Sequence, residues 1–241
     1  MNILVLGASS AIGAGVAESF SPGNRLLITG RDASRLGRAA DRCRAAGAAL
    51  VVEMTWDLRR GSGDLKDAAV GWRPDLVINA ASAASRLRDH QVAADDMEGI
   101  LAVDLAVPLD VIRAVFPERE SRPVGVVFVS SILSVVKSPD REIYGALKRI
   151  HERALQGLAA ARPDLRLLIV RISKRIPTDG ESPETGRLGT AVLNGYRDGK
   201  RVIYYGAAGR MIEALFNVQP LLFALAVKIS RFVQGKFSTS M

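Results

Sequence analysis

Short apolar runs alternate with longer segments of helical character along most of the chain. The runs are almost wholly hydrophobic instead of alternating between apolar and polar residues. This is typical of strands that are covered on both faces in a parallel sheet. We expect such strands over residues 2–6, 25–29, 49–54, 76–79, 124–130 and 165–172, with a further one over 201–205.

The segments between the runs predict helices, one from the first turn to about residue 20 and others over 32–46, 95–116 and 141–161. The alternation of strand and helix predicts an α/β fold, a doubly wound parallel sheet of the Rossmann type. We assign residues 1–206 to one dinucleotide-binding and catalytic domain and 207–241 to a C-terminal helical extension of it. The polar, Pro- and Gly-containing stretch 174–187 predicts a mobile active-site loop, because too little chain follows it for a second core.

Composition narrows the class of protein. The 241 residues suffice for one large domain, and 48% are hydrophobic. One cysteine, Cys43, excludes an internal disulfide and a cysteine metal cluster, and two histidines exclude a histidine-rich metal site, so we expect no metal. The first residues lack the basic leading region of a signal peptide. We therefore expect a cytoplasmic protein, with a peripheral position at the inner membrane face as the alternative.

The net charge of +8 is concentrated near the C-terminus. From Arg197 onward seven basic residues accompany two acidic ones, beside the most apolar stretch of the chain. Such a stretch needs a partner, and we expect the domain's own body or a second copy in a homo-oligomer, with a membrane surface as the alternative. The uncharged run 214–227 is too short to span a membrane. Without a helix-turn-helix, zinc or aromatic-basic motif, we expect no nucleic acid partner.

A small-residue turn lies between the first strand and the first helix. Backbone N–H groups at such a helix start bind a pyrophosphate, and small side chains let it come close. The alternative is a tight strand-to-helix connection. We expect cofactor contacts from Gly7, Ser9, Ser10, Ala11, Ile12 and Gly13.

The end of the second strand bears on the choice of cofactor. In a Rossmann unit this point lies near the adenine ribose, where an arginine favours the 2′-phosphate of NADP and an acidic residue favours NAD. Arg31 comes first and Asp32 follows it. We expect NADP in preference to NAD, with Asp32 capping the next helix. The alternative is that Arg31 is only a solvated surface residue.

Tyr144 and Lys148 stand four residues apart, so they share one helix face. A lysine ammonium there favours the tyrosinate form and makes the phenol a general acid or base. The pair alone fits a surface helix equally well. The small-residue turn, Asn79 after the fourth strand, Ser131 after the fifth and the Tyr/Lys pair together resemble the short-chain dehydrogenase/reductase family over residues 1 to about 172.

The resemblance implies a hydride transfer between a nicotinamide cofactor and a carbonyl or hydroxyl substrate. Tyr144 would exchange a proton with the substrate oxygen, Lys148 would support Tyr144 and bind the nicotinamide ribose, and Ser131 would hold the substrate. The resemblance implies further cofactor contacts from Asp57, Leu58, Asn79, Ala80 and Ala81. The composition of the C-terminus resembles that of polyprenylphosphoryl-pentose keto-reductases, so a lipid-linked or sugar-like substrate stands beside a small molecule.

The sequence departs from the family pattern at several points. Ala11 replaces a glycine, and Asn79-Ala80-Ala81-Ser82 replaces Asn-Asn-Ala-Gly. Asp104 stands where the family has a relay asparagine, and it is either a catalytic residue beside Lys148 or a packing residue of its helix. Ile172-Ser173 replaces Pro-Gly, with Thr178 as a substitute contact. These departures leave a second hypothesis, a nucleotide-binding regulator that has lost catalysis. We expect His151 to be a surface or packing residue.

Overall fold

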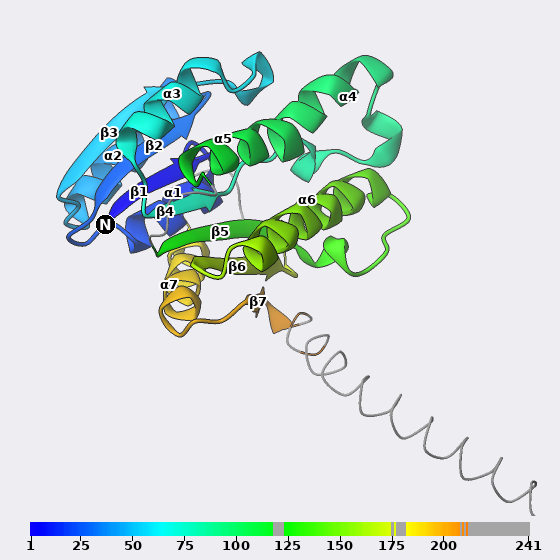
Figure 1. Ribbon diagram of the computed structural model, residues 1–241. Helices are drawn as coiled ribbons and strands as arrows, with labels where there is room; N and C mark the ends of the chain where they lie inside the picture. Colours follow the sequence, from blue (N-terminus) through cyan, green and yellow to red (C-terminus); the bar gives the residue numbers. More distant parts are fainter. Residues whose placement is uncertain (118–122, 175, 177–181, 208, 210, 212–241) are drawn as a thin grey trace, which may run out of the picture.

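The computed structural model describes residues 1–117, 123–174, 176, 182–207, 209 and 211. Its centre is a seven-stranded parallel sheet in the order β3-β2-β1-β4-β5-β6-β7 (Figure 1). The strands are β1 (Asn2–Leu6), β2 (Arg25–Gly30), β3 (Leu50–Thr55), β4 (Leu76–Asn79), β5 (Val124–Ser131), β6 (Leu165–Ile172) and β7 (Val202–Tyr205).

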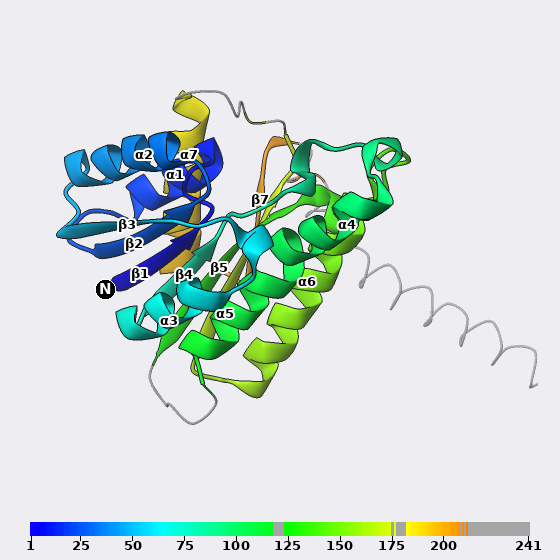
Figure 2. The same ribbon diagram turned by 90° about the horizontal axis from the view of Figure 1, so that it is seen from above.

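Helices cover both faces of the sheet (Figure 2). One layer contains α1 (Ala11–Ser19), α2 (Ala33–Ala45) and α7 (Pro183–Arg197), and the other contains α3 (Gly63–Trp72), α5 (Val107–Val115) and α6 (Glu142–Ala161). A helix α4 (Ala94–Leu101) continues through a π-helical turn, η4 (Ala102–Ala106), into α5. Single 3-10 turns form η1 (Leu58–Arg60), η2 (Ala84–Arg86), η3 (Asp89–Gln91) and η5 (Ile132–Ser134). The expected doubly wound α/β fold is confirmed.

Two hydrophobic cores result from the pleat of the strands. On β1, Ile3 and Val5 point into the core under α1, α2 and α7, whereas Leu4 and Leu6 point into the core under α3, α5 and α6. All four side chains are fully buried. A central parallel strand must therefore be apolar at every position, which is the pattern that identified it.

The structure corrects the expected elements in three places. The helices α3 and α7 were not predicted. The predicted loop over 174–187 is too long at its C-terminal end, because α7 begins at Pro183 after Ser182, whose hydroxyl accepts from the N–H of Glu184 at 3.2 Å. The single helix predicted over 95–116 is interrupted by the π-helical turn. Thr178 and residues 212–241 lie outside the described residues.

Candidate active site

The carboxyl ends of β1 and β4 mark the point at which the strand order changes direction, and this is where doubly wound folds bind ligands. Gly7 follows β1 with a φ of +86°, which favours glycine. A Cβ at this position would lie 2.7 Å from the backbone N of Ala81, in the loop after β4. The two chain segments that flank the crevice therefore touch each other through a residue that must be glycine.

The small-residue turn is built as the start of a helix. The Ser10 hydroxyl donates to the Gly7 carbonyl at 2.8 Å and accepts from the N–H of Gly13 at 3.0 Å. As the first two residues of α1, Ala11 and Ile12 direct their N–H groups out of its amino end. This is a fit for the pyrophosphate of a dinucleotide, because N–H donors and the positive end of the helix dipole face the same point.

Ser9 lies on the other side of the turn, against the end of β2. A Cβ on Gly30 would lie 2.4 Å from the Ser9 hydroxyl, so Gly30 leaves the space that Ser9 occupies. Arg31, the next residue, is exposed. Asp32 caps α2, since its carboxylate accepts from the N–H of Arg35 at 2.9 Å. The expected cap is confirmed, and it leaves the Arg31 guanidinium at the same edge as the small-residue turn.

The ends of β3 and β4 complete the predicted cofactor groove. Asp57 caps η1 by accepting from the N–H of Arg59 at 3.0 Å, and Leu58 is buried beneath it. The buried side chain of Asn79 accepts from the N–H of Ala81 at 3.1 Å. Because these residues follow neighbouring parallel strands, they share one edge of the sheet.

The predicted reacting residues come from β5 and α6. Ser131 ends β5, and its hydroxyl accepts from the N–H of Leu133 at 3.2 Å. Tyr144 is half-buried on α6, and the Lys148 Nζ lies 5.6 Å from the centroid of its ring. A Cβ on Gly145 would lie 2.6 Å from the Leu133 carbonyl oxygen. A glycine at this position thus lets the helix that carries Tyr144 approach the segment that follows Ser131.

Lys148 is almost wholly buried, at 1% exposed. Its Nζ lies 3.4 Å from Asp104 Oδ1 and 3.4 Å from the carbonyl oxygen of Ala81, to which it donates. A buried ammonium without a partner would be very costly, so the carboxylate fixes the position and charge of this lysine. The structure places Asp104 beside Lys148, which is the position that the first of its two alternatives requires.

Asp104 is itself held by the loop after β4. Its Oδ1 accepts from the hydroxyl of Ser82 at 2.6 Å, and its Oδ2 accepts from the N–H groups of Ala83 at 2.6 Å and Ala84 at 3.1 Å. With Lys148, four donors surround one carboxylate whose side chain is fully buried. The loop between β4 and α4 is therefore anchored to α6 through Asp104.

Sequence reasoning missed two buried polar residues that follow Lys148 on α6. His151 is fully buried, so the expectation of a surface position is wrong and that of a packing position is right. Burial lowers its pKa to about 4. Glu152 accepts from the Ser130 hydroxyl at 2.6 Å and pairs with Arg171 at 2.7 Å. Their spacing of three and four residues from Lys148, which puts them on the same helix face, was the available signal.

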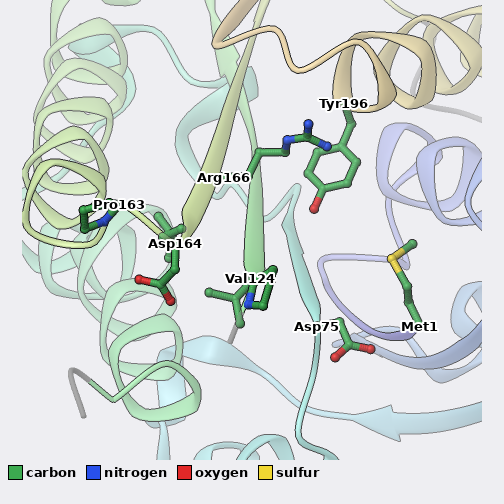
Figure 3. A pocket seen from close by; sticks show the side chains of 9 residues that line it. Met1, Asp75, Val124, Pro163, Asp164, Arg166 and Tyr196 are labelled. Carbon is green, nitrogen blue, oxygen red and sulfur yellow. The ribbon is translucent and has the colours of Figure 1, made fainter. Parts of the chain in front are cut away.

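Other parts of the described structure are weaker candidates for a functional site. A cavity of about 630 Å³ lies at the opposite, amino edge of the sheet, where Arg166 and Tyr196 face Asp75 and Met1 (Figure 3). It is remote from every predicted site residue, so we assign it no part in the predicted chemistry. Among the described residues no cluster of His, Cys, Asp and Glu could hold a metal ion. No helix in that part of the chain is long and apolar enough to cross a membrane.

Known proteins share both the sequence pattern and the fold of this chain. A family model described as short chain dehydrogenase matches residues 1–170. An uncharacterized oxidoreductase of Staphylococcus saprophyticus is 28% identical over 191 residues, which are 76% of this chain and 80% of that protein.

Two solved structures illustrate the similarity in fold. A short-chain dehydrogenase from Sphingobium yanoikuyae in complex with NADPH is 25% identical, with a TM-score of 0.75, over 92% of this chain and 95% of that one. A bulky-bulky ketone specific alcohol dehydrogenase from Comamonas testosteroni is 22% identical, with a TM-score of 0.75, over 92% and 93%.

Proposed function

Since the chain belongs to the short-chain dehydrogenase/reductase family of NAD(P)-dependent oxidoreductases, we propose that it transfers a hydride between NADP(H) and a carbonyl or hydroxyl substrate. The observation that carries this proposal is the buried ammonium of Lys148 beside Tyr144, held in place by the carboxylate of Asp104. An ammonium held there lies close to the phenol that would give up and regain a proton in the reaction.

The residues present fit the cofactor. The turn from Gly7 to Gly13 would hold the pyrophosphate, Asp57 and Leu58 would border the adenine, and Asn79 with Ala80 and Ala81 would border the ribose on the nicotinamide side. When bound, the nicotinamide supplies or accepts the hydride. Arg31 supports NADP in preference to NAD, and the Sphingobium relative, which was solved with NADPH, supports the same choice.

Two side chains would act on the substrate oxygen, and two more would support them. The Tyr144 hydroxyl donates a proton to it during reduction and takes the proton back during oxidation. Ser131 donates a hydrogen bond that orients the same oxygen. Lys148 would lie next to Tyr144 and donate to the ribose, while Asp104 holds the lysine. Each polar group of the site thus takes part in proton transfer or in positioning.

The substrate class stays broad. A small carbonyl or alcohol compound and a lipid-linked, sugar-like one are both compatible with the reacting residues, because the contacts that would distinguish them come from segments beyond β6. We also propose a homo-oligomer, with a peripheral membrane contact through the C-terminal extension 207–241 as the alternative. Light scattering and co-sedimentation with anionic vesicles, at low and at high salt, separate the two.

The function is tested with Tyr144→Phe. We expect this variant to bind NADPH as the unaltered protein does, by fluorescence titration, and to lose nearly all turnover in a screen of carbonyl compounds. Lys148→Met should weaken both binding and turnover, because the lysine has two roles. Turnover that persists in Tyr144→Phe would refute the assignment. NADPH binding by the unaltered protein without turnover of any carbonyl compound would favour the nucleotide-binding regulator.

A further inference from the structure

The backbone carbonyl of Asp104 lacks the partner that a regular helix would give it. Four residues further on, the donor would be Pro108, which has no N–H. The helix passes this point in the π-helical turn η4, in which the N–H of Val107 bonds to Ala102, five residues back. A buried carbonyl is more stable with a donor, so a donor from outside this helix can take the place of the missing N–H.

His151 supplies that donor. Its Nδ1 lies 2.8 Å from the carbonyl oxygen of Asp104, and its ring stacks on Phe128 of β5 with 4.2 Å between centroids and 23° between planes. A carbonyl oxygen only accepts, so Nδ1 carries the proton. In the described part of the structure Nε2 is buried and has no hydrogen-bond partner.

Three charged groups surround the imidazole of His151. Lys148 and Glu152 flank it on α6, and the carboxylate of Asp104 faces it from η4. Burial is the largest cause of its lowered pKa, so the ring is neutral at neutral pH. A neutral ring with Nδ1 protonated is the form that the contact to Asp104 requires.

We infer that His151 is a positioning residue of the catalytic centre, which fixes the π-helical turn from which the Asp104 carboxylate reaches Lys148. Asp104 of η4 contacts one turn of α6 through both its backbone and its side chain. Its carbonyl accepts from His151, and its side chain pairs with Lys148 at 3.4 Å. The inference rests on the proposed function, since it assigns His151 a role in the same proton transfer.

The functional test compares two substitutions. His151→Phe keeps an aromatic ring on Phe128 and removes the donor, whereas His151→Asn restores an N–H near the position of Nδ1. We expect His151→Phe to bind NADPH normally, to lose about tenfold or more in kcat/KM, and to shift the pH profile of kcat/KM, because small displacements of catalytic groups are costly. His151→Asn should recover most of the rate and the original profile. A His151→Phe profile identical to that of the unaltered protein, or no recovery in His151→Asn, would overturn the inference.

A second measurement is independent of turnover. The chain has two histidines, and His90 is exposed, so His90→Gln leaves His151 as the one imidazole. In nuclear magnetic resonance with labelled histidine we expect the Nδ1–H tautomer and no titration near the ordinary pKa of 6.5. An Nε2–H tautomer, or titration near 6.5, would overturn the inference. If NADPH binds and no carbonyl compound is turned over, the proposed function fails and this measurement still decides the contact of His151.

Discussion

Arg31, which is exposed, is the residue that we propose to decide the choice of cofactor. We expect the unaltered protein to bind NADPH more tightly than NADH, and Arg31→Ala to lose most of that preference. A charge-assisted contact to a phosphate contributes about 1.5–3 kcal/mol, or about ten- to a hundredfold in affinity. Titration of both cofactors by fluorescence measures the ratio.

Arg35 offers a matched control for this measurement. It is also exposed and lies on the first turn of α2, but it pairs with Asp32 at 3.4 Å. Arg35→Ala should leave the ratio of the two affinities nearly unchanged. Equal affinities of the unaltered protein for NADPH and NADH would contradict the assignment of Arg31.

In the proposed mechanism Asp104 introduces a negative charge beside Lys148, near the group that would transfer the proton. Its carboxylate disfavours a second negative charge on Tyr144, while Lys148 favours it. We expect Asp104→Asn to retain activity, because the amide oxygen can accept from the loop N–H groups and the amide N–H can donate to the Ser82 hydroxyl. We also expect it to move the basic-side optimum for alcohol oxidation to lower pH. The pH profile of kcat/KM with one substrate measures this.

Asp110→Asn is the control for this profile, since Asp110 is a surface carboxylate of the next helix that pairs with Lys66 at 3.1 Å. It should leave the profile unchanged. An unchanged profile in Asp104→Asn as well would mean that the carboxylate does not act on proton transfer. A collapse of activity would mean that it takes a direct part in the chemistry.

At the scale of elements, the approach of α6 to η5 depends on a single glycine. A Cβ at Gly145 would lie 2.6 Å from the carbonyl oxygen of Leu133, whereas one at Gly157 of the same helix would meet nothing within 4 Å. We expect Gly145→Ala to destabilise the protein by about 1–3 kcal/mol and to lower kcat/KM, since α6 must shift with Tyr144.

Gly157→Ala is the matched substitution and should stabilise the protein by up to about 1 kcal/mol, because alanine is the better helix former. Chemical unfolding of both variants at neutral pH gives the two free energies. Equal effects of the two substitutions would show that the packing of α6 on η5 is not tight at this point.

The helix α7, which the sequence did not predict, has a physical reason for being missed. α7 contains three glycines after its first turn, Gly186, Gly189 and Gly195, which lower its helix propensity. A Cβ on Gly189 would lie 2.3 Å from the carbonyl oxygen of Gly15 in α1, so this glycine serves the packing of two helices. Tertiary contact here outweighs local preference, and a single sequence does not display it.

At the scale of the whole molecule, the sheet was predictable because central parallel strands are apolar at every position. The same order of strands and turns placed Gly7, Asn79, Ser131 and Tyr144 at one edge. What could not be predicted is how residues from different elements meet inside the protein. The bond from His151 to the Asp104 carbonyl depends on the missing N–H of Pro108 and on the distance between two helices, and only the first of these is visible in the sequence.

The burial of His151 also has a consequence for the stability of the whole protein. Its pKa is 6.5 in the unfolded chain and about 4 in the folded protein. As the pH falls below 6.5, the unfolded state binds a proton that the folded state refuses, so the free energy of unfolding decreases until the pH reaches about 4. The loss should amount to about 3 kcal/mol, at about 1.4 kcal/mol per pH unit.

Urea unfolding of the unaltered protein and of His151→Phe between pH 7 and pH 4 isolates this contribution, because the variant lacks the titrating group. We expect the difference in the free energy of unfolding between the two proteins to change across this window and to be constant above it. Glu184, whose pKa is lowered to about 2 by hydrogen bonds from Lys174, Tyr205 and Arg187, loses its contribution between pH 4.5 and 2. The window for Glu184 lies almost wholly below the one for His151. A difference in the free energy of unfolding between the two proteins that is constant from pH 7 to 4 would mean that His151 takes up its proton as easily in the folded protein as in the unfolded chain.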